Sequence, residues 1–372
     1  MNKSLHIVSF DYPFPPYYGG IIDVFYKIKA LNALGVEIHL HYFSDSIYQH
    51  QELEELCHTI TPYPKSSVLS SSIFSKIPLR MLVRRSSELT KNLAKNDFPI
   101  LYEGLQSSYS SLHADLKKNK KFLRCHNAEA NYARELAQSE NNLLKKIIFS
   151  TEALITSRFE KKLHQFDGLF VLSEDDKKYF NRSNEKIKIV PIFHGQEEIE
   201  VREGLGDYVL FHGNLTVAEN VVTAKWIFTE IAPELPHLKF ILAGKSLDGN
   251  ILNQYPSKNV ECVFNPNQQQ MKNLIQNAQI VLLKTMVPSG IKLKLIDSLA
   301  QARHIISDFN SVEKSGMSHY VSLASTTNDF LKKIEELMYQ EVDKTQIQKR
   351  AEVFNQAFNN KVNAKKIVEE LF

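Results

Sequence analysis

A glycine, two lysines and an aspartate follow an apolar run in the C-terminal half of the chain, in an order that suits an anion site. Gly290, Lys292, Lys294 and Asp297 come after the run 280–283, in the order strand, turn, helix. Backbone N–H groups at a helix start attract anions, and lysine ammonium groups add positive charge. A carboxylate one turn further on could accept hydrogen bonds from sugar hydroxyls. The spacing indicates a site for a nucleotide-like group; the alternative is a helix with exposed lysines.

Two loops in the N-terminal half contain further residues suited to ligand binding. Adjacent glycines, Gly19 and Gly20, open a predicted helix after the apolar run 5–10, where they allow a close backbone approach to a bound group. The alternative is a turn that needs positive φ. The segment 124–129 sets a cation, an imidazole, an amide and a carboxylate together after another apolar run. Such a cluster can hold a hydroxylated or phosphorylated ligand, although the histidine could equally be a satisfied core residue and the carboxylate a helix-start residue. The four side chains are those of Arg124, His126, Asn127 and Glu129.

Apolar runs alternate with helical patterns along the chain, which predicts α/β sheets of the doubly wound type. Residues 195–206 are polar, acidic and flanked by glycines, and favour a linker. We expect two facing Rossmann-like domains with a cleft between them: residues 1–194, completed by the end of a long last helix at 355–372, and residues 207–354. The predicted strands cover 5–10, 36–42, 99–102, 121–124, 168–172, 187–191, 208–211, 238–244, 260–264, 280–283 and 304–307.

Length and composition narrow the class of protein. A chain of 372 residues exceeds what one hydrophobic core usually organises. The formal charge of +3 is too small to indicate nucleic-acid binding, and no DNA-reading motif is present. The three cysteines are far apart, which indicates neither a disulfide framework nor a zinc site. With no signal-peptide pattern and no apolar run near the ~20 residues of a membrane span, we expect a cytoplasmic protein.

Four motifs, in order along nearly the whole chain, resemble those of the retaining glycosyltransferases of family 4, which have the GT-B fold. The loop 13–20 resembles the family's proline-rich loop with paired glycines, and 124–132 resembles its R-x-H-N-x-E-x-x-Y run. The segment 210–215, followed by Asn220, resembles the opening of the donor domain. The segment 290–297 resembles the G-x-K/R-x-K-x-x-E motif of one subgroup.

The resemblance implies a role for each matching residue. Asp297 would accept hydrogen bonds from the nucleotide ribose, and Gly20 would lie against the diphosphate. His126 would lie near the transferred sugar. The residues Gly290, Ile291 and Lys292 would lie by the diphosphate or the donor sugar.

The chain also departs from the family pattern. Ser289 and Asp297 stand where the family has paired glutamates, so the first carboxylate is absent. Asn214, after Gly213, and Asn220 stand where an arginine and a lysine are usual. We therefore expect Lys292 and Lys294 to carry more of the phosphate charge, with Lys245 as a further contributor.

These observations predict a transferase that moves a sugar from a nucleotide-diphosphate donor to a glycan, lipid-linked or other glycoconjugate acceptor. No DxD pair stands at a strand end, and we expect metal-independent chemistry without a cofactor. Two alternatives remain: a non-catalytic GT-B partner subunit that binds a nucleotide or glycan, and a sugar-nucleotide epimerase.

A basic, apolar segment, 77–85, could bring the protein to the inner face of an anionic membrane. The alternative is a helix packed on its own domain with solvated arginines. The run 143–163 is similar, with more mixed charge.

Overall fold

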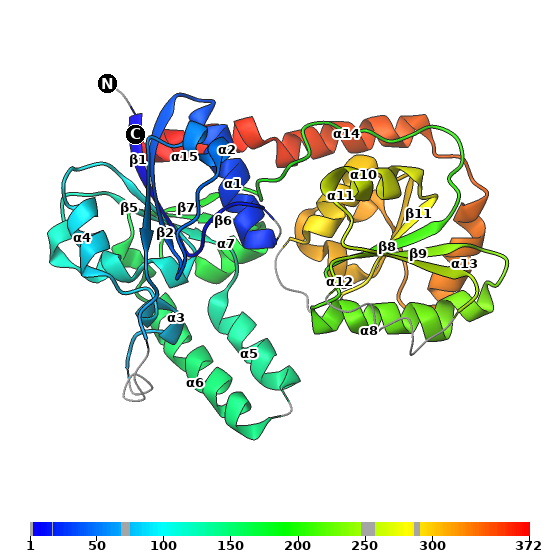
Figure 1. The fold of residues 1–372 in the computed structure, drawn as a ribbon, viewed down its shortest axis with the longest axis horizontal. Coiled ribbons are helices and arrows are strands. Elements are labelled where there is room, and N and C mark those ends of the chain that lie inside the picture. The colour runs from blue at the N-terminus through cyan, green and yellow to red at the C-terminus, as the bar shows by residue number, and fades with distance from the viewer. Residues whose placement is uncertain (1–2, 17, 68–74, 141, 247–256, 286–290) are drawn as a thin grey trace. The chain divides into compact units, whose positions relative to one another are not determined.

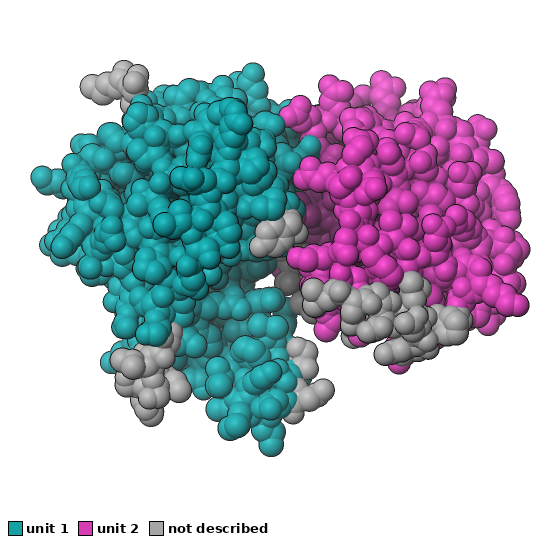
Figure 2. All heavy atoms as spheres, viewed as in Figure 1, with its two compact units in different colours: residues 1–195, 358–372 teal, residues 196–357 magenta. Residues whose placement is uncertain are grey.

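The computed structural model divides into two compact units, residues 1–195 with 358–372, and residues 196–357 (Figure 2). The structure describes residues 3–16, 18–67, 75–140, 142–246, 257–285 and 291–372. Two of the predicted site residues, Ser289 and Gly290, therefore lie outside the described residues. None of the helices in the described ranges is both long and apolar enough to cross a membrane.

The described part of the first unit contains a sheet of seven parallel strands in the order β3-β2-β1-β4-β5-β6-β7 (Figure 1). Alternate side chains of β1 enter different cores: Leu5 and Ile7 pack with helices α1 and α15, and Val8 packs with α4, α6 and α7. Helices thus cover both faces of the sheet. The strands are β1 (Lys3–Ser9), β2 (Val36–Phe43), β3 (Thr59–Tyr63), β4 (Ile100–Glu103), β5 (Lys121–Cys125), β6 (Gly168–Val171) and β7 (Ile187–Ile189). The α-helices are α1 (Gly19–Asn32), α2 (Gln51–Leu56), α3 (Leu79–Leu82), α4 (Ser87–Leu93), α5 (Glu129–Ser139), α6 (Leu143–Glu160), α7 (Glu174–Phe180) and α15 (Asn360–Leu371).

The described part of the second unit contains a sheet of six parallel strands in the order β10-β9-β8-β11-β12-β13. On β8, Val209 and Phe211 enter a core with residues of α8 and α13, so His212 points to the other face. The strands are β8 (Val209–His212), β9 (Phe240–Gly244), β10 (Val260–Phe264), β11 (Ile280–Leu283), β12 (His304–Ser307) and β13 (Ser322–Leu323). The α-helices are α8 (Ala218–Trp226), α10 (Gln268–Asn277), α11 (Leu293–Gln301), α12 (Phe309–Val312), α13 (Thr327–Met338) and α14 (Lys344–Phe358).

Two parallel sheets with helices confirm the predicted α/β fold class. The single last helix was wrong: the chain forms α14 and α15, separated at Asn359. Asn359 has non-helical ψ of 111°, and its side chain accepts a hydrogen bond of 2.9 Å from the backbone N–H of Val362. This is an N-cap, which starts a new helix rather than continuing the old one.

The segment predicted as a linker packs on the second unit. The backbone N–H of Glu200 donates to Ala300, and Arg303 donates to the carbonyl groups of Glu203 and Gly204. Residues 196–206 therefore belong to the second unit.

Candidate functional site

The two N-terminal loops singled out in the sequence come together at the carboxyl edge of the first sheet. Phe10, just after β1, contacts both: a Cβ on Gly20 would lie 2.7 Å from its ring, and the His126 ring lies edge-on to it at 5.9 Å. Gly104, after β4, has φ +74°, and a Cβ there would lie 3.5 Å from Cδ2 of the His126 ring. Gly20 and His126 therefore share one neighbourhood, at the sheet edge where open α/β sheets bind ligands.

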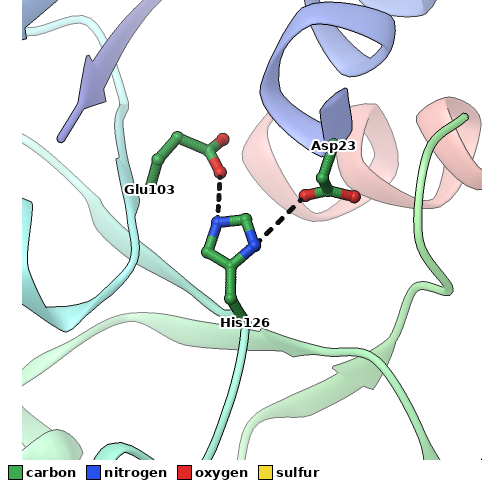
Figure 3. Close-up of side chains that lie close together, drawn as sticks. All are labelled: Asp23, Glu103 and His126. Atoms are coloured by element: carbon green, nitrogen blue, oxygen red, sulfur yellow. Dashed lines mark hydrogen bonds and ion pairs between the residues drawn. The ribbon is translucent and has the colours of Figure 1, made fainter. Parts of the chain in front are cut away.

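His126 lies between two buried carboxylates (Figure 3). Its Nε2 is 3.2 Å from Glu103 Oε2, and its Nδ1 is 3.7 Å from Asp23 Oδ2. The side chains of Asp23 and Glu103 are fully buried, whereas His126 keeps 12 % of its side-chain surface exposed. The imidazole is thus the member of this group that a ligand can reach, and the carboxylates orient it.

Two buried cations balance these carboxylates. Lys27 Nζ lies 2.9 Å from Asp23 and 2.7 Å from Glu103, and Arg124 donates two hydrogen bonds to Asp23. Burial raises the pKa of Asp23, but Arg124, Lys27 and His126 outweigh it and hold the pKa well below its usual range. For Glu103, burial is likewise outweighed by Lys27 and by the hydrogen bond to His126, and its pKa is lowered. Both groups are therefore carboxylates at neutral pH.

Asp23, Glu103 and His126 each offer one ligand atom, and these atoms lie within 4.8 Å of one another. A divalent cation there would have to compete with Lys27 for both carboxylates, and would approach the Arg124 guanidinium as well. Two cations already paired with the carboxylates make the cluster a poor match for metal binding.

Burial changes the expected role of Arg124. This side chain is fully buried, and besides Asp23 it donates to the backbone carbonyl groups of Val190 and Pro191. With most of its donors used inside the unit, Arg124 holds Asp23 in place, and its contact with a ligand stays a prediction.

The remaining predicted residues of this region lie nearer the surface. Gly19 is exposed at the start of α1, and Asn127 is half-buried. The Asn127 amide makes no hydrogen bond to the described residues, so it remains available to a ligand. Glu129 begins α5 and pairs with Arg80 at 3.3 Å, while burial raises its pKa.

In the second unit, two strand-end glycines bring two backbones together. A Cβ on Gly244, at the end of β9, would overlap the carbonyl oxygen of Gly213. A Cβ on Gly213 would in turn lie 2.9 Å from Lys294 Nζ and 3.1 Å from Cγ of Asn220. Glycine is required at Gly244, where the clash is with backbone, and at Gly213 the missing side chain leaves the room into which the Lys294 ammonium group reaches.

The Lys294 ammonium group lies among polar groups of α8 and the loop before it. It donates to Asn220 Oδ1 at 2.5 Å and lies 5.0 Å from the centre of the Phe211 ring. The Asn220 amide in turn donates to the backbone carbonyl of Asn214 at 2.8 Å. Burial lowers the pKa of Lys294 to about 8, so the group is still mainly charged at neutral pH.

His212 lies beside this lysine with a buried Nε2 that has no hydrogen-bond partner among the described residues. Burial, with a smaller contribution from the Lys294 charge, lowers the pKa of His212 to about 3. His212 is therefore neutral at physiological pH, and the positive charge at this strand end comes from Lys294.

Asp297 and Lys292 belong to the same helix as Lys294. Lys292 is the N-cap residue of α11, and Asp297 accepts a hydrogen bond of 2.8 Å from Gln196 Nε2. Burial raises the pKa of Asp297 to about 6. Ile291 is half-buried next to Lys292. Lys245 follows Gly244, and its backbone carbonyl accepts from Leu215, which ties the loops after β8 and β9 together.

Sequence reasoning missed three buried groups of the first unit. Asp23 and Lys27 lie one turn apart on an otherwise apolar face of α1, and this opposite-charge spacing is a signal that could have found them. Glu103 comes after the apolar residues of β4 and precedes a glycine. This position at a strand end is the signal that could have found it.

Comparisons with known proteins identify the fold. No family model matches the chain. An uncharacterised 44.6 kDa protein from the cps region of Klebsiella pneumoniae is 24 % identical over 345 residues, covering 87 % of this chain and 88 % of that protein. The crystal structure of TarM superposes with a TM-score of 0.68 at 10 % identity, covering 100 % of this chain and 99 % of that one.

Two further solved structures are similar over the whole chain. Anabaena Alr3699/HepE, in complex with UDP and glucose, gives a TM-score of 0.63 at 11 % identity, covering 100 % of this chain and 99 % of that one. WaaG, a glycosyltransferase involved in lipopolysaccharide biosynthesis, gives 0.64 at 9 % identity, covering 99 % of both chains. The chain therefore has the GT-B fold of these glycosyltransferases.

Proposed function

We propose that this protein is a glycosyltransferase that moves a sugar from a nucleotide-diphosphate donor to a glycan, lipid-linked or other glycoconjugate acceptor. One observation carries the proposal: the partly buried Lys294 ammonium group lies beside Gly213, at the carboxyl edge of the second sheet. A cation held at this edge, where the backbone is kept close by glycine, suits a diphosphate. The shared fold with glycosyltransferases supports the same reading.

In the second unit, Lys294 and Lys292 bind the donor diphosphate and stabilise the negative charge that develops on the leaving group. Such fixed positive charge is the kind of transition-state stabilisation that needs no metal ion. Asp297 uses Oδ2, the oxygen not bonded to Gln196, to accept from the ribose. Gly213, Asn214, Lys245, Ser289, Gly290 and Ile291 complete the proposed donor contacts.

In the first unit, His126 contacts the transferred sugar, and Gly20 lets the α1 N-terminus approach the donor. The Asp23 and Glu103 carboxylates orient the imidazole, as their distances to its two nitrogen atoms allow. Asn127 and Glu129 are the nearby groups that can bind sugar hydroxyls. We propose retention of configuration, which rests on the family resemblance, and assign no covalent nucleophile.

The sequence favoured the segment 77–85 as the membrane contact. We propose instead the tip of α6, residues 143–148. In the former, Met81 and Leu82 are buried, and Arg84 donates to the backbone carbonyl of Phe10. On α6, by contrast, large apolar side chains are exposed next to two exposed lysines, Lys145 and Lys146. The apolar residues and their exposed fractions are Leu143 75 %, Leu144 73 %, Ile147 61 % and Ile148 49 %.

Helices α5 and α6 pack side by side and extend away from the sheet (Figure 1). An exposed apolar tip with adjacent lysines fits the interface of an anionic bilayer, where apolar side chains enter the acyl boundary and ammonium groups meet the headgroups. This surface would bring the enzyme to a lipid-linked acceptor.

Donor hydrolysis tests the proposal without knowledge of the acceptor. A panel of nucleotide-sugars is incubated with the protein, and released sugar is measured alongside nucleotide binding. We expect slow hydrolysis of one donor, and Lys292→Ala to reduce the rate far more than it reduces the free energy of unfolding. Nucleotide binding without sugar release from any donor would favour a non-catalytic partner subunit, and no nucleotide binding at all would overturn the donor site.

A further inference from the structure

A cavity in the second unit lies at the edge of the sheet opposite the proposed donor residues. It has a volume of about 410 Å³ and is lined by the start of β12, the segment 319–322 and α14. Strand β12 begins at His304, in the cavity wall, and ends at Ser307. The proposed donor residues cluster at the carboxyl ends of β8 and β9, whereas this cavity lies at an amino end, so the two are distinct.

The charged side chains in the cavity wall are all basic. Its charged and titratable side chains are those of Arg303, His304, His319, Lys349 and Arg350, together with the phenol of Tyr320. No aspartate or glutamate is among the described residues that line it. A cavity of this size with cations and no carboxylate concentrates anions.

Arg350 is the unusual member of this wall. Its side chain is only 5 % exposed, yet it forms no ion pair with a carboxylate in the described ranges, and its Nε has no hydrogen-bond partner there. One terminal nitrogen donates to the backbone carbonyl of Ala302, at the end of α11. The carboxyl end of α11 carries a partial negative charge, which offsets only part of the positive charge of Arg350.

Burial lowers the pKa of Arg350 to about 10, and no nearby carboxylate counteracts that effect. The Arg350 and Arg303 charges also help to lower the pKa of His304, after burial itself. Buried charges in proteins are normally paired, and an unsatisfied buried donor calls for a partner. An anion in the cavity would supply the negative charge that the described residues do not provide to Arg350.

We propose that this cavity binds a phosphate group, either as inorganic phosphate or as part of a small phosphorylated sugar, through Arg350 and Lys349. Arg350 lines the cavity, and a guanidinium group matches the oxygen atoms of a phosphate in geometry as well as charge. The exposed Lys349 and His319 stand at the cavity wall, where they can meet the rest of the ligand.

The test is calorimetric titration with sodium phosphate, and separately with glucose 6-phosphate, against sodium chloride at equal ionic strength. If inorganic phosphate binds tightly and glucose 6-phosphate does not bind more tightly, the ligand is the free phosphate ion. If glucose 6-phosphate binds more tightly, the ligand is a sugar phosphate. Gln346→Glu places a carboxylate in the cavity wall from an exposed position of α14, so folding is not at risk. We expect it to weaken binding at least about tenfold.

Gln348→Glu is the matched control, because it makes the same charge change on an exposed position of the same helix outside the cavity. Arg350→Met should abolish binding, and Lys294→Met, in the proposed donor site, should leave it intact. Three results would each overturn the proposal. They are phosphate binding that is unchanged in Gln346→Glu, phosphate binding that is lost in Lys294→Met, and no phosphate binding to the native protein. Since the test measures phosphate alone, its result is independent of whether the protein transfers sugars.

Discussion

The Lys294 ammonium group donates a hydrogen bond of 2.5 Å to the side-chain oxygen of Asn220. Asn220 stands where the family that the sequence resembles usually has a lysine. In this chain the positive charge thus reaches the end of β8 from α11 rather than from α8. Because Gly213 has no side chain, there is space beside it for the Lys294 ammonium group.

The first prediction concerns the charge of Lys294. Its pKa of about 8 means that the ammonium group loses its proton as pH rises through that value. A diphosphate is bound by the charged form, so nucleotide-diphosphate affinity should be constant near pH 7 and fall above pH 8. Calorimetric titration between pH 6.5 and pH 9 measures this change.

Lys294→Met is the control for that pH dependence. It should weaken nucleotide binding by about 1.5–3 kcal/mol at pH 7, as expected for a lost hydrogen bond to a charged group. It should also remove the fall in affinity above pH 8. An unchanged pH profile in the variant would assign the titration to another group.

The second prediction uses the raised pKa of Asp297, about 6. Asp297→Asn should weaken nucleotide binding at pH 7.5 by about 1–3 kcal/mol, because the ribose would lose a charged acceptor. At pH 5 the native carboxyl group is protonated, and the two proteins should bind with similar affinity. Calorimetry at both pH values separates this result from a general loss of the site.

The same substitution should have the opposite effect on stability. A carboxyl group whose folded pKa lies above its unfolded value of 3.8 favours folding at pH values below 3.8, and this contribution is lost as pH rises through 6. Asp297→Asn should therefore raise the free energy of unfolding at pH 7, by up to about 3 kcal/mol, and not at pH 3.5. Weaker binding in a more stable protein would exclude misfolding as the cause; a variant that is less stable at pH 7 would contradict the assignment.

Most strands of both sheets are predictable from the sequence because strands buried on both faces are continuous apolar runs. Strand β3 escapes this rule: it lies at the edge of its sheet, contains two polar threonines, and has Pro62 between Thr61 and Tyr63. Strand β13 has two residues, Ser322 and Leu323, too few for any pattern.

The site is predictable only in part. His126, Lys292, Lys294 and Asp297 follow apolar runs at spacings that suit ligand binding, and the sequence alone singles them out. The partners of His126 come from α1 and β4, which are distant from it in sequence, and only the fold brings them together. The sequence also predicted a ligand contact for Arg124. Its burial could not be read from the local sequence, because it depends on segments that follow it by more than 60 residues.

The third prediction concerns the buried network that orients His126. Lys27→Met removes a fully buried cation and leaves Asp23 and Glu103 without one partner. Breaking a buried ion pair in this way should cost about 3–5 kcal/mol in the free energy of unfolding. Lys29→Met, an exposed position on the same helix, should cost less than about 0.5 kcal/mol.

Denaturant unfolding of both variants at pH 7 measures the difference. Equal stability of the two would mean that Lys27 does not neutralise the carboxylates. Lys27→Met should also lower turnover, because His126 would lose the fixed position of Glu103.

The last prediction tests the α6 tip on membranes. Replacing Leu144 and Ile147 together by serine removes two of its most exposed apolar side chains, 73 % and 61 % exposed, without touching the buried face of α6. The double variant should no longer float with vesicles of phosphatidylcholine and phosphatidylglycerol, whereas the native protein should float and be released by salt. Val222→Ser, at an exposed apolar position of α8 in the other unit, serves as the control and should float like the native protein. Flotation of the double variant at native levels would place the membrane contact elsewhere, and native flotation on phosphatidylcholine alone would remove the role of Lys145 and Lys146 in headgroup binding.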